Sequence, residues 1–160
     1  MKKLLSIIVF MFVALAVNAQ TYKFYQTDNC HNQLRLNTKT GEVYQIQDDG
    51  QKFLINDAVT PSNTIENRYL LYKTQNMWTF ILLDRWQGKL WQCQFSVKGT
   101  EYMLTVPINT TPLSYSERPT FTIEPLVSMF QFYLINENNG EMWKFQWSTK
   151  GDDYRWIEKM

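Results

Sequence analysis

One sequence pattern occurs three times along the chain, and this repetition restricts the fold more than any other feature. Residues 21–47 match residues 68–94, and residues 80–106 match residues 132–158. The glycines Gly41, Gly88 and Gly140 occupy one position of the pattern. The second match repeats Phe80, Leu82, Gly88, Trp91, Gln94, Ser96, Lys98, Gly99 and Tyr102. A repeat of roughly 50 residues indicates copies of one supersecondary unit that pack against one another.

The second copy gives the clearest view of the unit. Residues 68–75 and 78–84 are rich in Leu, Ile and Tyr, and residues 89–95 alternate between apolar and polar side chains. Residues 102–108 form a further apolar run that contains Pro107 near its end. Alternation with period two is typical of a strand with one buried face, and proline is tolerated at strand ends. We therefore expect four strands in this unit.

The centre of each copy predicts a β-hairpin. Asp84 or its counterparts Asn37 and Asn136 end one strand, and a glycine opens the next. Asp and Asn side chains bond back to nearby backbone in turns, and glycine accepts the positive φ that such turns require. The corresponding strands are expected at residues 33–37 and 43–47 in the first copy, and at 129–136 and 142–147 in the third.

Three units of about four strands predict a single all-β domain. We favour a β-trefoil, with a small propeller-like ring or another closed β architecture as alternatives. A propeller ordinarily closes with about four to eight blades, so three would have to oligomerise or distort. The domain is expected to span residues 20–160, with repeats at about 21–60, 68–109 and 118–160. Polar segments that contain Pro and Ser, residues 57–67 and 109–119, separate the copies.

Residues 1–19 have the three parts of a secretory signal. Lys2 and Lys3 supply a positive start, an apolar run follows from Leu4 to Val17, and Ala19 offers a small residue for cleavage. The apolar run is shorter than the roughly 20 residues that span a bilayer. We expect cleavage after Ala19, a secreted or periplasmic location in a Gram-negative bacterium, and no membrane span in the mature chain.

The charge balance argues against a polyanionic partner. The whole chain has a formal net charge of +1, and removal of Lys2 and Lys3 lowers this to about −1. Binding to nucleic acid depends on clustered basic side chains, and no such block occurs here. We expect a glycan or protein partner, no nucleic acid, and a monomer or small oligomer.

Residues that carry catalysis or bind metals are scarce. His31 is the single histidine and follows Cys30 directly, so the two side chains would leave a strand on opposite faces. Zinc sites need three or four spaced ligands. The acidic residues fall mainly beside glycines or in turn positions, among them Asp84 and the pair Asp48–Asp49. We therefore expect no enzyme, no catalytic residue, no bound metal and no cofactor.

The two cysteines allow two interpretations. Export would permit a disulfide between Cys30 and Cys93, although two cysteines are too few for a disulfide scaffold. Cys93 aligns with Ile46 and Phe145, which favours a buried, unbonded side chain. Both alternatives stay open from the sequence.

Residues that break the repeat are the candidates for ligand binding. Trp86 is expected at a turn tip where the other copies have Lys39 and Asn138. Its ring is either exposed, where it would stack on a sugar or protein, or folded back over a neighbouring strand. The other candidates are Arg85, Trp78, Trp156 and Arg155. The glutamines 45, 47, 92 and 94 are expected opposite the aromatic side chains, where they are positioned to bond sugar hydroxyls or water.

Aromatic residues stand out in the composition, because Phe, Trp and Tyr make up 16% of the residues. Many of them are expected in the core, and those that break the repeat are candidates for binding. We expect a secreted, non-enzymatic domain that recognises a glycan or a cell-surface protein. Two alternatives are an accessory subunit of a cell-envelope complex and a trefoil-type protease inhibitor. The inhibitor would present residues 57–67 or 109–119 as its reactive loop.

Overall fold

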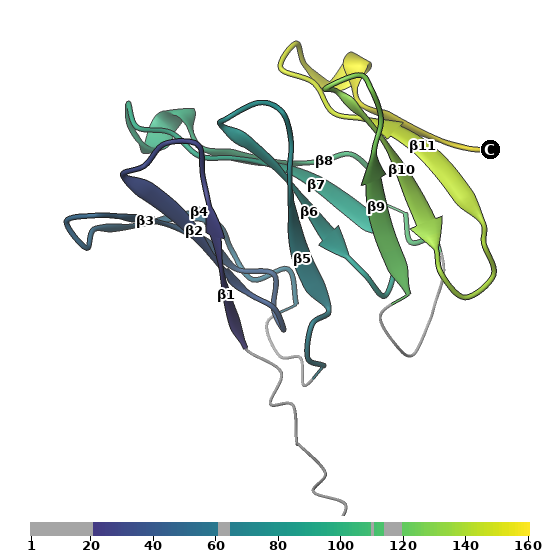
Figure 1. The fold of residues 1–160 in the computed structure, drawn as a ribbon, viewed down its shortest axis with the longest axis horizontal. Helices are drawn as coiled ribbons and strands as arrows, with labels where there is room; N and C mark the ends of the chain where they lie inside the picture. The colour runs from purple at the N-terminus through teal and green to yellow at the C-terminus, as the bar shows by residue number, and fades with distance from the viewer. Residues whose placement is uncertain (1–20, 61–64, 110, 114–119) are drawn as a thin grey trace, which may run out of the picture.

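Three four-stranded antiparallel sheets, one for each repeat, lie side by side (Figure 1). A computed structural model describes residues 21–60, 65–109, 111–113 and 120–160. The expected signal segment 1–19 lies outside the described residues, as do parts of both linkers. The first sheet contains β1 (Tyr22–Gln26), β2 (Asn32–Asn37), β3 (Val43–Gln47) and β4 (Lys52–Asn56). The second contains β5 (Tyr69–Lys73), β6 (Thr79–Asp84), β7 (Lys89–Gln94) and β8 (Leu104–Pro107). The third contains β9 (Phe121–Pro125), β10 (Gln131–Asn136), β11 (Met142–Gln146) and β12 (Trp156–Lys159).

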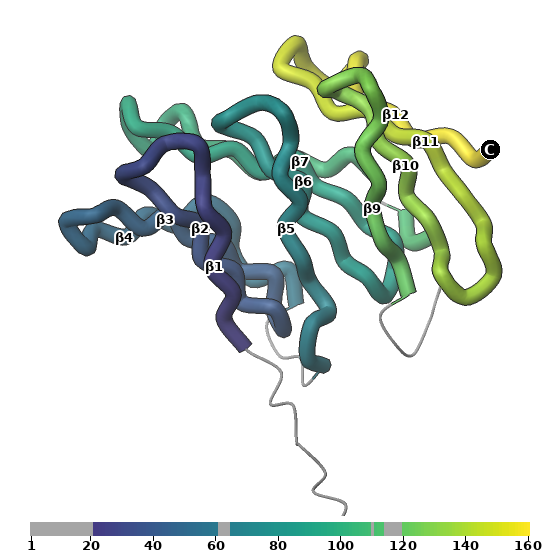
Figure 2. The backbone as a smooth tube through the Cα atoms, in the orientation of Figure 1, coloured from purple at the N-terminus to yellow at the C-terminus, as the bar shows by residue number. Residues whose placement is uncertain are grey.

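Each sheet is a meander in which consecutive strands are neighbours (Figure 2). The strands expected from the sequence are confirmed, with small shifts at their ends. The fourth strand of the second repeat begins at Leu104 because a short 3-10 helix, η1 (Thr100–Tyr102), occupies the residues before it. An equivalent helix, η2 (Asp152–Tyr154), precedes β12. No described helix is long and apolar enough to cross a membrane.

The predicted hairpin turn is present in all three sheets. The carboxylate of Asp84 accepts a hydrogen bond from the backbone N–H of Trp86 at 2.9 Å, and the amide oxygens of Asn37 and Asn136 do the same for their own turns at 3.0 Å. Gly88 then adopts a φ of 66°. A Cβ at Gly88 would also lie 3.0 Å from the ring of Phe121, so both backbone and packing restrict this position to glycine.

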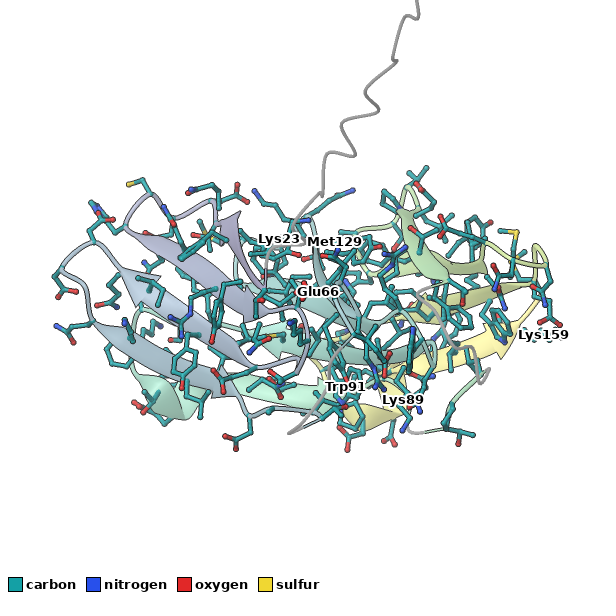
Figure 3. The ribbon with its side chains drawn as sticks, turned by 90° about the horizontal axis from the view of Figure 1, so that it is seen from below. Lys23, Glu66, Lys89, Trp91, Met129 and Lys159 are labelled. Atoms are coloured by element: carbon teal, nitrogen blue, oxygen red, sulfur yellow. The ribbon has the colours of Figure 1, made fainter. Side chains whose placement is uncertain are left out.

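The hydrophobic core forms two layers, one on each face of the second sheet. One layer joins the first and second sheets and contains Leu34, Leu71 and Phe80. The other joins the second and third sheets and contains Ile81 and Phe132, among others. Every residue of β6 is buried, because its two faces pack against different neighbouring sheets. In Figure 3, seen from below, side chains fill the space between the three sheets.

Two of the glutamines lie between sheets and are not exposed. The side chains of Gln45 and Gln92 are 0% and 1% exposed. The side-chain oxygen of Gln45 accepts a hydrogen bond from the N–H of Ser96, and that of Gln92 accepts one from the N–H of Ser148. The expectation that these side chains face solvent or sugar hydroxyls is therefore wrong. Both glutamines satisfy backbone groups of the next sheet.

The all-β class and the three repeated units are confirmed, whereas the β-trefoil is not. The strands of a trefoil pair across the three units to close a common barrel. Among the described residues, each strand pairs only within its own sheet, and no closed barrel is formed. The units meet through side chains and a few backbone bonds, such as Tyr69 N–H to the oxygen of Thr38 at 2.9 Å.

The two cysteines are unbonded in this structure. Cys93 is fully buried in the layer between the first and second sheets, and Cys30 is exposed in the turn after β1. Burial raises the pKa of the Cys93 thiol to about 12. Cys93 therefore packs as a small apolar side chain, and the disulfide between Cys30 and Cys93 is not formed.

Candidate binding clefts

The second and third sheets each carry a cleft built from the same seven positions of the repeat. The second-sheet cleft has a volume of about 360 Å³ and is lined by Trp78, Gln94, Phe95, Ser96, Val97, Lys98 and Tyr102. The third-sheet cleft has a volume of about 130 Å³ and is lined by Phe130, Gln146, Trp147, Ser148, Thr149, Lys150 and Tyr154. Each residue of one list is the repeat counterpart of a residue in the other.

Backbone and amide contacts hold the two clefts in the same way. The side-chain NH2 of Gln94 donates to the backbone oxygen of Tyr102 at 3.1 Å, and that of Gln146 donates to the oxygen of Tyr154 at 3.0 Å. The hydroxyl of Ser96 accepts the backbone N–H of Lys98 at 3.0 Å. In the third sheet, the hydroxyl of Ser148 accepts the backbone N–H of Lys150 at 2.9 Å. The loops after β7 and β11 therefore repeat as closely as the strands.

A tilted aromatic pair forms the base of each cleft. The ring centroids of Trp78 and Phe95 lie 5.2 Å apart at 54°, and those of Phe130 and Trp147 lie 5.0 Å apart at 48°. The indole N–H of Trp147 donates to the backbone oxygen of Met129, so the polar group of that buried ring is satisfied. Phe95 and Trp147 are fully buried, so the partly exposed aromatic surface of each cleft comes from Trp78 or Phe130.

A tyrosine and a lysine complete the rim of each cleft. Tyr102 and Tyr154 are the last residues of η1 and η2, and they are 53% and 51% exposed. Lys98 and Lys150 are also exposed, and the Lys150 ammonium lies 5.6 Å from the centre of the Tyr154 ring. An aromatic base with hydroxyl and ammonium groups at its rim suits a ligand with one apolar face and several polar substituents.

The first sheet has a polar version of this cleft, of about 350 Å³. Its His31 takes the place of Trp78, and its Asp48 takes the place of Phe95. Their backbones pair in the same way, because the N–H of Asp48 donates to the oxygen of His31 as that of Phe95 does to Trp78. His31 Nδ1 lies 2.8 Å from the Asp48 carboxylate, and both side chains are exposed. His31 lies in the turn between β1 and β2.

The three clefts lie at one end of the stack of sheets. The turns after β1, β5 and β9, which precede or contain His31, Trp78 and Phe130, are all at the upper edge of Figure 1. Val97 lines both the first-sheet and the second-sheet cleft, so these two clefts are adjacent. This edge of the molecule presents a row of related depressions.

Of the five ligand-binding candidates from the sequence, Trp78 lines a cleft and Arg155 borders one. The guanidinium of Arg155 donates to the backbone oxygen of Ser148, a lining residue of the third-sheet cleft, at 3.4 Å. It also pairs with Asp152 at the start of η2. Arg155 is therefore placed to fix the loop that forms this cleft.

The other three candidates lie elsewhere. Trp78 precedes β6, whereas Arg85 and Trp86 follow it. The length of β6, about 20 Å, therefore separates Trp78 from Arg85 and Trp86. Trp86 is partly buried with the Arg68 guanidinium 5.2 Å from its ring centre, which agrees with the folded-back alternative and not with a freely exposed indole. Arg85 joins two sheets by donating to the oxygen of Phe121 at 3.1 Å. Trp156 lies on the outer face of the third sheet.

Sequence reasoning missed most of the cleft, including the exposed tyrosines. Lys98 and Tyr102 belong to the repeated pattern together with Lys150 and Tyr154, whereas the candidates predicted from the sequence are residues that break the pattern. The available signal was their chemistry. A lysine and a tyrosine beside a glycine turn, repeated in two copies, are poor core residues and have to be explained by the surface.

The described residues contain no group of three or more His, Cys, Asp or Glu side chains arranged to hold a metal ion. The second-sheet and third-sheet clefts present aromatic, amide, hydroxyl and ammonium groups, and the first-sheet cleft presents an imidazole and two carboxylates. Comparison with protein-family models, with curated proteins and with solved structures gives no match.

Proposed function

We propose that the chain is an exported, non-enzymatic binding domain that recognises a glycan through the second-sheet and third-sheet clefts. The observation that carries the proposal is the recurrence of one cleft at seven equivalent positions, with an exposed tyrosine in each. Packing explains why buried positions recur. It does not explain why exposed lysines and tyrosines recur at the rim of a depression.

The chemistry of the cleft favours a sugar. Pyranose rings present a face of C–H groups that packs on aromatic side chains, and their edges carry hydroxyls that bond to amide, phenol and ammonium groups. Tyrosine and tryptophan serve this use well because they offer a large rigid contact area with a polar end. Lys98 and Lys150 add a positive charge to each cleft, which also suits sugars with carboxylate substituents.

Two equivalent clefts on one edge favour a repeating ligand. A polymer that occupies both clefts converts the second binding step into an intramolecular one, which raises the overall affinity without any new contact. An oligosaccharide with one kind of sugar unit provides such a ligand. Export by the segment 1–19 would bring the domain to the compartment where such polymers occur.

An oligosaccharide array tests the proposal. The purified protein is applied to immobilised neutral and acidic oligosaccharides, beside the double variant Tyr102→Ala/Tyr154→Ala. Tyr22→Ala is the matched control, because Tyr22 is 43% exposed and lies at the end of β1 distant from the clefts. We expect retention of one class of oligosaccharide by the wild type and by Tyr22→Ala, and its loss in the double variant. Absence of any retention, or equal retention by the double variant, would refute the proposal.

A further inference from the structure

The two contacts between sheets use the same polar link. Gln45 of the first sheet accepts the N–H of Ser96 in the second at 3.4 Å. Gln92 of the second sheet accepts the N–H of Ser148 in the third at 3.2 Å. Each glutamine lies on the third strand of its sheet, and each serine follows the third strand of the next sheet. The link therefore marks one geometric position in the contact between neighbouring units.

A tyrosine forms a second repeated link. The backbone N–H of Leu71 donates to the hydroxyl of Tyr25 at 3.2 Å, which joins the first sheet to the second. The hydroxyl of Tyr72 lies 3.3 Å from that of Thr122, which joins the second sheet to the third. Both tyrosines are on the first strand of one sheet and reach the first strand of the next.

The outer face of the third sheet carries charged residues at both link positions. Lys144 occupies the position of Gln45 and Gln92, and Glu124 occupies the position of Tyr25 and Tyr72. Tyr133 lies between them, since it is the cross-strand partner of both. Ile135 and Met142 on this face are only partly buried, where their counterparts in the other sheets are fully buried. This face has the form of a contact surface without a neighbour among the described residues.

The outer face of the first sheet has opposite charges at or beside the receiving positions. Asp49 occupies the position of Ser96 and Ser148. Lys23 shares the inner face of β1 with Tyr25. On the outer face, Phe24 occupies the position of Leu71, and the cross-strand partner of Phe24 is Arg35. The Arg35 guanidinium lies over the rings of Tyr22 and Tyr44, and the Nε of Arg35 is buried without a hydrogen-bond partner among the described residues.

We propose that the outer face of the third sheet binds the outer face of the first sheet of a second copy of this chain. Lys144 would then face Asp49 of the second copy, and Glu124 would face Arg35. Polar outer faces are also found on end units that only prevent aggregation. Such end units do not require opposite charges at matching positions, and here Asp49 occupies one link position and Arg35 lies beside the other. Phe24 and Leu54, which are 51% and 43% exposed on the first sheet, would be covered by the contact.

The number of sheets favours a closed dimer. A contact between two different faces either closes into a ring or continues as a filament. Rings of four-stranded sheets around an axis close with about four to eight members. Two copies of three sheets supply six, which falls within this range. A third copy would exceed it.

Sedimentation velocity with charge variants tests this contact. We expect the wild type to sediment with the mass of two chains in low salt and to dissociate more readily in high salt. Lys144→Glu and Asp49→Lys should each raise the dissociation constant about tenfold or more, because each places like charges together. The combined variant Lys144→Glu/Asp49→Lys restores opposite charges and should recover the dimer. Asp57→Lys is the control, because it makes the same change in charge as Asp49→Lys. Asp57 is exposed and lies at the other end of the first sheet.

The wild-type mass decides the outcome even if a variant fails to fold, which circular dichroism would detect. A mass of one chain at every concentration tested overturns the proposal. So does a mass that grows without limit, which would indicate a filament. A combined variant that folds but does not recover the dimer shows that Lys144 does not face Asp49, and this too overturns the proposed contact.

Discussion

Gln45 of the first sheet accepts a hydrogen bond from the backbone N–H of Ser96 in the second sheet, and both residues are buried. Gln92 and Ser148 repeat this bond between the second and third sheets. A buried backbone N–H that loses its acceptor keeps its desolvation cost, so these glutamines act as supports between units. The repeat therefore specifies how units attach to one another as well as how each unit folds.

Removal of this link should destabilise the domain. Gln92→Ala leaves the N–H of Ser148 without its acceptor, and we expect the free energy of unfolding to fall by about 1–3 kcal/mol. Gln94→Ala is the control, because Gln94 is partly exposed and bonds within its own sheet. Its effect should stay within about 0.5 kcal/mol. Urea unfolding measures both. Equal losses for the two variants would show that the buried link has no special role.

The ion pair between Arg68 and Asp84 can be replaced by the residues that the third repeat has at the same positions. Arg68 contacts both carboxylate oxygens of Asp84, at 3.1 and 2.6 Å, and the two residues are 8% and 1% exposed. Asp84→Asn leaves a buried guanidinium without its counter-charge, so we expect a loss on the order of 3 kcal/mol. The third repeat has Thr120 and Asn136 at these positions. Arg68→Thr added to Asp84→Asn should recover much of the loss in thermal unfolding. A double variant less stable than Asp84→Asn would contradict this account.

The two thiols should differ strongly in reactivity. Cys30 is exposed, whereas Cys93 is fully buried and its pKa is raised to about 12 by desolvation. A thiol reagent at neutral pH should label one cysteine per folded chain and two per unfolded chain, because the thiolate is the reactive form. Mass spectrometry of digested protein assigns the label. If Cys30 is not labelled in the folded protein, and is still not labelled after unfolding without a reductant, the two cysteines form a disulfide instead.

Stability should decrease at alkaline pH in a way that Cys93 partly controls. Between the ordinary thiol pKa of 9.0 and about 12, the unfolded chain releases the Cys93 proton while the folded chain retains it. The unfolded state binds fewer protons, so the free energy of unfolding falls as the pH rises through this range. Tyr25 adds a similar effect above pH 10, because burial raises its pKa to about 12. Cys93→Val should make the decrease shallower, and Cys30→Ser should leave it unchanged. An identical slope for all three proteins would count against the buried thiol.

The sequence predicts the unit better than the contacts between units. Alternation and turn residues act over a few positions, so the strands and the hairpin at Asp84 and Gly88 could be placed from them. The same strand pattern serves a trefoil, whose strands pair across units, and a row of meanders, whose strands pair within them. That choice depends on contacts such as Gln92 with Ser148, which are distant in sequence, and the pattern alone does not contain them.

The candidate site shows the same limit. The sequence leaves Trp86 either exposed at a turn tip or folded back, and it is the contact with Arg68, just before β5, that covers its ring. Conversely, Tyr102 and Tyr154 repeat and are nevertheless about half exposed. Repetition separates shared roles from individual ones, but it does not separate folding from binding when each unit carries its own copy of a cleft.

The most direct test of the account is the stoichiometry of binding. Isothermal titration with the oligosaccharide that the array retains most strongly, cut to the length that fills one cleft, should give two sites per chain. Tyr102→Ala and Tyr154→Ala should each reduce this to one, and the double variant should not bind. Two sites that persist in the double variant, or one site that neither substitution affects, would contradict the claim that the repeated clefts bind the ligand.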